Sequence, residues 1–178
     1  GNPLRLDVPL GPYPVAPVLV GSVGTLTFCI LLLGVAAFVM WRRPAEPAAG
    51  ALVLAGTGAL GSTVPFLLGL DPLDLVTGAW TFHLAATGGV YMLLWAGAIH
   101  FALVFPRPPS AFVRRPQLEL LPYLVVFGLE AVAVGVAWRT AGSAIEFFVT
   151  HATIQLGIVA GSMATSALAT VVRWRRSG

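Results

Sequence analysis

The fold of this chain is decided by the stretch from Asp74 to Pro109, DLVTGAWTFHLAATGGVYMLLWAGAIHFALVFPRPP. It contains no Asp, Glu, Lys or Arg between Leu75 and Phe105. As one helix, this uncharged run would be roughly 46 Å long, which is more than the ~30 Å hydrocarbon core of a bilayer. The stretch therefore predicts a membrane-spanning helix over residues 74–105.

The composition of the whole chain is also that of a membrane protein. Hydrophobic residues make up 57% of the 178 residues and charged residues only 10%, whereas about a quarter of a soluble domain is charged. The formal net charge is +3, but the basic residues are all arginines beside apolar runs, so we expect no nucleic-acid partner. The single cysteine, Cys29, excludes a disulfide or a cysteine metal site within the chain.

Two apolar runs precede this helix and two follow it. Together they predict an all-α, polytopic membrane helix bundle with five transmembrane helices in one domain. The proline-rich residues 1–14 are expected to form an extracytoplasmic lead-in, because prolines deny this segment helical hydrogen bonds. The predicted spans cover residues 15–41, 48–70, 74–105, 117–138 and 144–172.

The arginines predict how the bundle is oriented in the membrane. Cytoplasmic loops of membrane proteins carry the excess of positive charge. Eight of the ten arginines fall on one predicted side, so we expect the N-terminus outside and the C-terminus inside a bacterial cytoplasmic membrane. The eight are Arg42, Arg43, Arg107, Arg114, Arg115, Arg173, Arg175 and Arg176.

Small residues at four-residue spacing predict where helices approach one another closely. The second run contains two such pairs, Ala55 with Ala59 or Gly58 with Ser62, and Gly88 and Gly89 in the third run could allow bending or close packing. We expect the strongest ridge of this kind, in the fifth run, to pack within the chain, with a homodimer contact as the alternative. Its residues are Gly157, Gly161, Thr165 and Ala169.

Two histidines lie near the outer boundary of the predicted bilayer. Counted at about 1.5 Å per residue, His83 is about 36 Å from Arg107 and His151 is about 33 Å from Arg173. Facing imidazoles on neighbouring helices could ligate a b-type haem, or bind a metal such as zinc together with Glu146. The alternative is that each histidine bonds to water or to a backbone carbonyl at a polar interface.

His100 lies on nearly the same helical face as His83 but close to the inner boundary. No second helix has a histidine near that level, so two haems are excluded within the chain. We therefore expect His100 to be a packed or carbonyl-bonded residue that could respond to pH.

Glu130 is the most costly ionisable residue of the predicted bilayer core, about 22 Å from Arg115. Gln155, on the fifth helix, comes within about 5 Å of the same level and is its expected partner. We interpret Glu130 either as a ligand- or proton-sensing group, or as a protonated structural residue bonded to Gln155 or a threonine. With His83 and His151, these two residues form the candidate ligand-binding set.

Two segments resemble the membrane-embedded input regions of multi-span bacterial sensor histidine kinases of the ComP-like type. They are HFALVFPRPP, from His100 to Pro109, and RRPQLELLPYLV, from Arg114 to Val125. In that family, a helix ends in a similar His-x-x-Leu-x-Phe-Pro signature, followed by a short basic turn and a helix that opens with Leu-Pro-Tyr. The inner-interface motif of this chain comprises His100, Phe105, Pro106 and Arg107.

The resemblance implies a signal-input module whose last helix continues beyond Gly178 into cytoplasmic dimerisation and ATP-binding domains. It carries over no phosphoacceptor histidine. Independently of the resemblance, Phe101 and Phe105 share one helical face, Pro106 ends the span, and Arg107 anchors it at the interface.

No catalytic residue is predicted. The sequence has no nucleophile with a base and an orienting acid, no phosphate-binding glycine loop and no HExxH motif in a usable context. The leading hypothesis is a sensor-kinase input module that reads a ligand or membrane state in its outer half and shifts the fifth helix. The alternative is an accessory subunit of a larger respiratory or photosynthetic membrane complex that binds haem, quinone, lipid or pigment. A transporter is disfavoured, because few polar residues lie within the spans.

Overall fold

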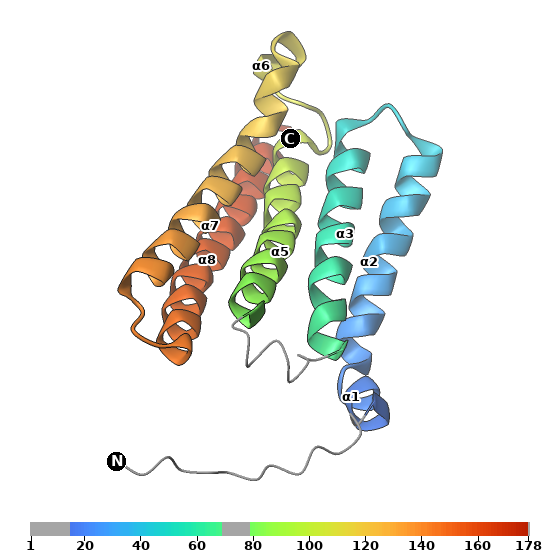
Figure 1. Cartoon of the computed structure of the whole chain (residues 1–178). Helices are drawn as coiled ribbons and strands as arrows, with labels where there is room; N and C mark the ends of the chain where they lie inside the picture. The colour runs from blue at the N-terminus through green and yellow to red at the C-terminus, as the bar shows by residue number, and fades with distance from the viewer. Residues whose placement is uncertain (1–14, 69–78, 178) are drawn as a thin grey trace, which may run out of the picture.

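The computed structural model describes residues 15–68 and 79–177, and the side-chain surroundings of residues 15–63 and 83–175. Every regular element in these ranges is helical, as predicted (Figure 1). The predicted lead-in over residues 1–14, the end of the second span at 69–70 and the start of the third at 74–78 lie outside the described residues. The elements are α1 (Val15–Gly21), α2 (Val23–Arg42), α3 (Pro47–Leu68), α5 (Ala79–Val104), α6 (Ser110–Arg114), the 3-10 helix η1 (Pro116–Leu120), α7 (Leu121–Thr140) and α8 (Ala144–Ser177).

Four helical segments of the described chain are long and apolar enough to cross a membrane. Large apolar side chains such as Leu31, Val132 and Leu156 remain exposed along them. Exposed apolar surface on this scale is costly in water but not in lipid, so the chain is a helical membrane protein. The four segments are Val23–Arg42, His83–Val104, Pro116–Thr140 and Ala144–Arg175.

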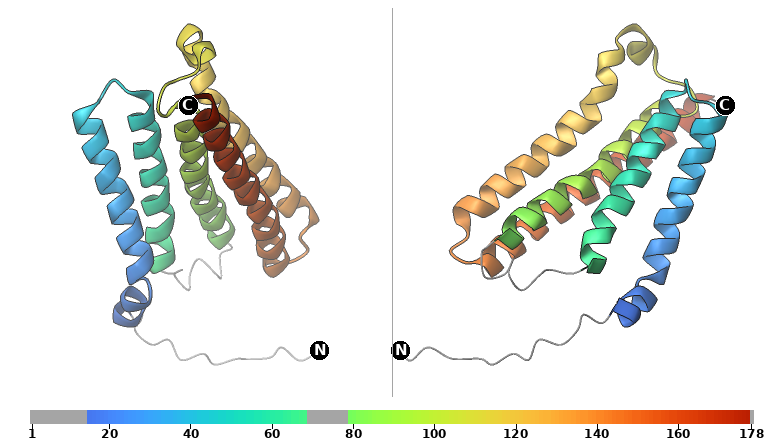
Figure 2. Two further views of the ribbon diagram at one scale, coloured as in Figure 1. Left: turned by 180° about the vertical axis from the view of Figure 1, so that it is seen from behind. Right: turned by 45° about the vertical axis from the view of Figure 1, so that its right-hand side comes forward.

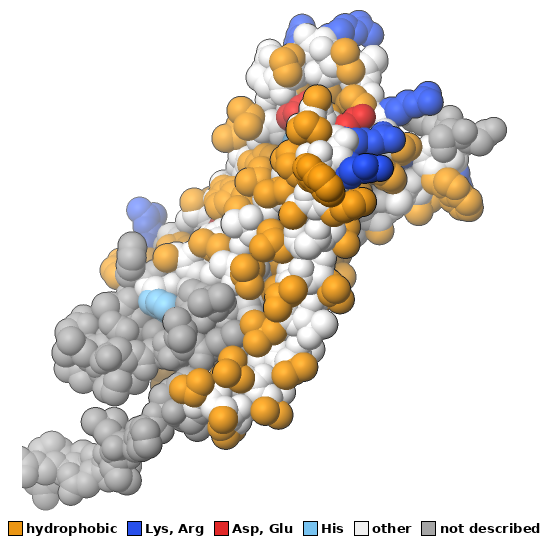
Figure 3. All heavy atoms as spheres, turned by 90° about the vertical axis from the view of Figure 1, so that its right-hand side faces the viewer, with side chains coloured by type: hydrophobic (Ala, Val, Ile, Leu, Met, Phe, Trp, Pro, Cys, Tyr) orange, Lys and Arg blue, Asp and Glu red, His pale blue; other side chains and the backbone are white. Residues whose placement is uncertain are grey.

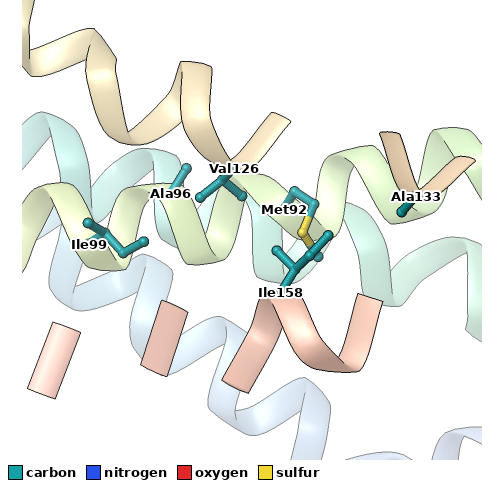
Figure 4. Close-up of a cluster of buried hydrophobic side chains, with 6 residues drawn as sticks. All are labelled: Met92, Ala96, Ile99, Val126, Ala133 and Ile158. Atoms are coloured by element: carbon teal, nitrogen blue, oxygen red, sulfur yellow. The ribbon is translucent and has the colours of Figure 1, made fainter. Parts of the chain in front are cut away.

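Helix α5 lies at the centre of the bundle. The pair α2 and α3 packs on one side of it through α3, and the pair α7 and α8 packs on the other side, where both helices contact α5 (Figures 1 and 2). The stretch that decides the membrane class therefore also supplies the central helix. The main buried apolar cluster joins α5 to α7 and α8 and contains Met92, Ala96, Ile99, Val126, Ala133 and Ile158 (Figure 4).

Glycines let α3 and α5 approach at backbone distance. A Cβ atom on Gly58 would lie 2.4 Å from the backbone nitrogen of Leu94, and one on Gly97 would lie 2.8 Å from the carbonyl oxygen of Ala51. Neither position could carry a side chain without moving the two helices apart. The close approach predicted at Gly58 is confirmed.

Most of the small-residue ridge on α8 does not pack against another helix. A Cβ atom on Gly157 or Gly161 would meet no atom within 4 Å, and Thr165 is exposed. These residues instead line an apolar groove of about 600 Å³ whose other walls come from α5, α6 and α7. The expectation of packing within the chain is therefore wrong for this part of the ridge.

The first apolar run, expected as a single span over residues 15–41, is interrupted. A turn at Ser22 divides it into α1 and α2. Gly21 and Gly24 flank the turn, and glycine has the lowest helix propensity apart from proline. The span itself is α2.

The last two runs differ from the prediction at their ends. The fourth run, expected from residue 117, begins with η1, and α7 starts at Leu121 with Pro122 in its first turn. Proline is tolerated there because a first-turn N–H has no helical acceptor. Helix α8 continues past the predicted end at residue 172 to Ser177.

Positive charge gathers at one end of the bundle (Figure 3). The turn between α2 and α3, the connection through α6 and η1, and the last turns of α8 all lie at this end (Figure 1). Arg139 lies at the opposite end, near the turn between α7 and α8. The arginines at the crowded end whose side chains are described are Arg42, Arg43, Arg107, Arg114, Arg115, Arg173 and Arg175.

Candidate ligand-binding site

Glu130, His151 and Gln155 meet inside the bundle. Glu130 lies midway along α7, while His151 and Gln155 lie one turn apart on α8 and project from the same face. His151 Nε2 lies 2.9 Å from Glu130 Oε1, and Gln155 Nε2 donates to the same oxygen at 3.3 Å. The pairing of Glu130 with Gln155 that depth counting predicts is confirmed.

The carboxyl group of Glu130 is buried but only half satisfied. The side chains of Glu130 and His151 are each 5% exposed. Glu130 Oε2 is buried and has no hydrogen-bond partner among the described residues. A buried polar atom in this state costs about 1–3 kcal/mol. The carboxyl group can therefore form one more hydrogen bond at a gain in free energy.

Gly88 on α5 leaves room for this cluster. A Cβ atom on Gly88 would lie 2.7 Å from Glu130 Oε1 and 2.8 Å from Gln155 Nε2. At the neighbouring Gly89, a Cβ atom would meet nothing within 4 Å. Of the two roles expected for this glycine pair, Gly88 performs close packing.

A cavity of about 220 Å³ adjoins the cluster, and His151 and Gln155 form part of its wall. The hydroxyls of Ser62, Thr63 and Thr87 each donate to a backbone carbonyl. The oxygens of Ser62 and Thr87 keep lone pairs that can accept a hydrogen bond, whereas Thr63 Oγ1 also lies 3.6 Å from Cys29 Sγ. A small, mainly apolar molecule with one or two polar groups would match this wall. The lining residues are Ser62, Thr63, Leu84, Thr87, Gly88, Tyr91, Phe148, His151, Ala152 and Gln155.

The aromatic ring of Phe147 packs against the His151 imidazole. The two rings stack with centroids 5.9 Å apart and an interplanar angle of 14°. Trp138 of α7 meets Phe147 edge-on, so ring contacts join α7 to α8 beside the cluster. No pattern considered in the sequence predicts a role for these aromatics. The signal available was the four-residue spacing of Phe147 and His151, which places both on one helical face.

His83 and Glu146 do not belong to the cluster of Glu130, His151 and Gln155. His83 is half-buried on α5, and its carbonyl oxygen accepts a hydrogen bond from Thr87. Glu146 Oε2 accepts a hydrogen bond from the Gly142 N–H at the exposed start of α8. No contact between the imidazoles of His83 and His151 is found, and no group of three or more His, Cys, Asp or Glu among the described residues could hold a metal ion.

The inner-interface motif lies at the other end of α5. His100 is buried, with Nδ1 3.0 Å from the hydroxyl oxygen of Tyr123 and Nε2 3.8 Å from Glu119 Oε2. The expectation of a packed residue is confirmed, but the bond is to a side chain of α7 instead of to a carbonyl. Phe101 and Phe105 stack with centroids 5.1 Å apart, as their spacing predicts.

Arg173 joins the end of α8 to the end of α5. Its guanidinium donates through Nη1 to the carbonyl oxygen of Leu103 and through Nη2 to that of Arg107. A cation is favoured at this place because the last carbonyls of a helix carry partial negative charge. Pro106 and Arg107, which follow α5, are exposed.

Comparison with known proteins gives no match to a family model, to a curated protein or to a solved structure. The fold and the site define the class of protein. The chain is a helical membrane protein with a buried cluster of carboxyl, imidazole and amide groups beside a small cavity. Function must be argued from that site, because a helix bundle alone is compatible with many functions.

Proposed function

We propose that the chain is the transmembrane signal-input module of a bacterial sensor kinase, and that it detects a small ligand in the cavity beside His151 and Gln155. The observation that carries the proposal is the buried Oε2 of Glu130, which has no hydrogen-bond partner within the described ranges and belongs to the cluster beside that cavity. An ionisable side chain within a membrane span is costly, and such residues mark functional sites.

The proposal includes a topology. Helix α3 has 22 residues and serves as the fifth span beside the four apolar segments. The arginine-rich end faces the cytoplasm of a bacterial cytoplasmic membrane, because positive charge is retained on that side. The N-terminus is then outside, the C-terminus is inside, and the cluster around Glu130 lies in the outer half of the bilayer.

Helix α8 carries the response from the cavity to the cytoplasmic end. It has 34 residues and is therefore about 51 Å long. His151 and Gln155 lie in its outer half, and Arg173 holds its inner end to the carbonyls at the end of α5. A ligand that draws His151 or Gln155 away from Glu130 shifts α8 against α5 and α7. The resemblance of residues 100–109 and 114–125 to kinase input regions supports a kinase as the receiver.

Filling the cavity tests this proposal. Ala152→Leu places three extra carbons in the cavity wall, whereas Ala160→Leu adds the same atoms at an exposed position of the same helix. We expect Ala152→Leu to change autophosphorylation of the full-length protein in nanodiscs by about tenfold, the effect of a ~1.4 kcal/mol shift in a two-state equilibrium. Ala160→Leu should match the parent protein.

Two outcomes would contradict the proposal. A reading frame without a dimerisation helix and an ATP-binding domain after Gly178 excludes the kinase. Equal autophosphorylation in Ala152→Leu and Ala160→Leu excludes this cavity as the input site. A haem absorption band that is lost in His151→Ala would instead favour the accessory-subunit alternative.

A further inference from the structure

Two arginines line a large cavity between the end of α5 and the last turns of α8. The cavity has a volume of about 820 Å³, and Arg107 and Arg173 form its polar wall. Both Nη atoms of Arg173 donate to backbone carbonyls, while its buried Nε has no hydrogen-bond partner in the part of the chain that the structure describes. Within the described chain, no carboxylate pairs with Arg107 or Arg173.

The positive charge of this cavity is therefore not neutralised by the chain. The carbonyl oxygens of Leu103 and Arg107 orient the Arg173 guanidinium but carry only partial charges. Guanidinium groups bind phosphate oxygens strongly, because their planar set of N–H donors matches phosphate geometry. An anionic phosphate group is the ligand whose charge complements this pair.

An apolar groove adjoins the charged cavity. Leu103 lines both, and α8 supplies Gly157, Gly161 and Thr165 to the groove and then Ala169 to the cavity in one-turn steps. The two glycines keep the groove open, since nothing lies within 4 Å of an added Cβ atom at either position. From Arg173 to Gly157 the helix is about 24 Å long, more than the ~15 Å hydrocarbon thickness of one leaflet.

We propose that Arg107 and Arg173 bind the phosphate of an anionic phospholipid, and that one acyl chain of this lipid occupies the groove along Gly161. A free phosphate ion would satisfy only the charged part, whereas the adjoining groove requires an apolar chain on the same molecule. The lipid belongs to the leaflet at the arginine-rich end. This site is separate from the cavity beside His151, and it does not depend on the signal-input function.

Lipid retention measures both halves of the site. The full chain is reconstituted in phosphatidylcholine nanodiscs that contain a minor fraction of phosphatidylglycerol, then released in mild detergent for native mass spectrometry. We expect the parent protein to retain phosphatidylglycerol preferentially. Arg107→Gln should lower that retention about fivefold, the effect of one arginine near an anionic headgroup. Arg175→Gln removes the same charge from an exposed position of α8 outside the cavity and should change it little.

A second pair of variants, matched in the bulk that they add, tests the groove. Gly161→Leu fills it and should lower retention even though both arginines remain, whereas Ala164→Leu adds the same bulk at an exposed position of α8 and should not. A thermal melt in the same nanodiscs shows that each variant is folded. Arg107→Lys, which keeps the charge but loses the planar set of donors, should recover only part of the retention.

Three results would overturn the proposal. The first is equal retention of phosphatidylglycerol and phosphatidylcholine by the parent protein. The second is an equal loss in Arg107→Gln and Arg175→Gln, which would show attraction by overall charge alone. The third is displacement of the lipid by inorganic phosphate together with full retention in Gly161→Leu, which would show a phosphate site without an acyl groove.

Discussion

At the scale of single residues, Glu130 distributes its hydrogen bonds unevenly. Gln155 Nε2 donates to Oε1 and His151 Nε2 lies 2.9 Å from the same oxygen, while Oε2 has no hydrogen-bond partner among the described residues. In a low-dielectric interior, a polar network that is partly satisfied is less stable than one that is fully satisfied. One new hydrogen bond can therefore alter the free energy of this cluster by an amount that a ligand can supply, which is the requirement for a ligand-dependent shift of α8.

Gly88→Ala should destabilise this cluster. The new methyl group would lie 2.7 Å from Glu130 Oε1 and 2.8 Å from Gln155 Nε2, so one of these side chains must move and lose its bond. We expect a loss of about 1–3 kcal/mol in the free energy of unfolding, from strain and from the unpaired polar atom. Equilibrium unfolding in mixed detergent micelles measures it.

Gly89→Ala is the control for this substitution. It makes the same change one residue along α5, at a position where the methyl group meets nothing within 4 Å. The higher helix propensity of alanine should leave this variant unchanged or more stable by up to about 1 kcal/mol. Equal effects at the two positions would show that the cluster contributes nothing to stability.

The sequence predicts only part of this site. Residue counting places Glu130 and Gln155 within about 5 Å of one level, and a hydrogen bond joins them in the structure. The same counting places His151 about 11 Å above Glu130, yet His151 Nε2 lies 2.9 Å from Glu130 Oε1. Counts along separate helices contain neither the tilt of the helices nor the length of the side chains. They could not identify Gly88, whose role depends on which helix it faces.

At the scale of helices, the contact of α3 with α5 depends on glycines, which have no side chain to keep the two backbones apart. In lipid, apolar side chains gain little by leaving their surroundings, so helices associate through close packing. Gly58 and Gly97 bring the two backbones together in this way. The contact fixes α3 beside α5, where Ser62 and Thr63 close the cavity next to His151.

Gly58→Ala should therefore weaken the bundle. The added methyl group would lie 2.4 Å from the backbone nitrogen of Leu94, and a backbone atom cannot rotate away as a side chain can. We expect a loss of about 1–3 kcal/mol, as for other overpacked positions. Gly50→Ala makes the same change on α3 at a position where the added methyl group meets nothing within 4 Å. Its free energy of unfolding, measured in micelles, should equal or exceed that of the parent protein.

The two small-residue patterns show what spacing can and cannot predict. Four-residue spacing indicates that a helix permits close approach, but it does not identify the partner. Gly58 packs closely against α5, whereas Gly157 and Gly161 line an open groove. A homodimer contact at this ridge stays a prediction. A pattern on one helix therefore gives a surface property, and the arrangement of the others decides its use.

At the scale of the molecule, lipid limits the fold more than any single contact does. Backbone groups in a bilayer must be satisfied within the segment, so long apolar runs predict helices with little ambiguity. That is why the helical class and most spans follow from the sequence. The sequence does not predict that α5 lies at the centre, with α2 and α3 on one side and α7 and α8 on the other (Figure 1). That arrangement follows from packing among all the helices.

Most arginines lie at one end of the bundle, which predicts the orientation of the chain in the membrane, and cysteine labelling tests that orientation. Single cysteines are introduced in a Cys29→Ala background, because Cys29 is the only native thiol. An impermeant maleimide should label Thr140→Cys in intact cells, and should label Arg43→Cys and Ser110→Cys only after the membrane is opened, since positive charge is retained in the cytoplasm. Reversed labelling at all three sites would invert the orientation but keep the spans. Labelling of Ser110→Cys and Thr140→Cys from one side would contradict a membrane crossing by α7, and with it the depth of Glu130 on which the proposed input site depends.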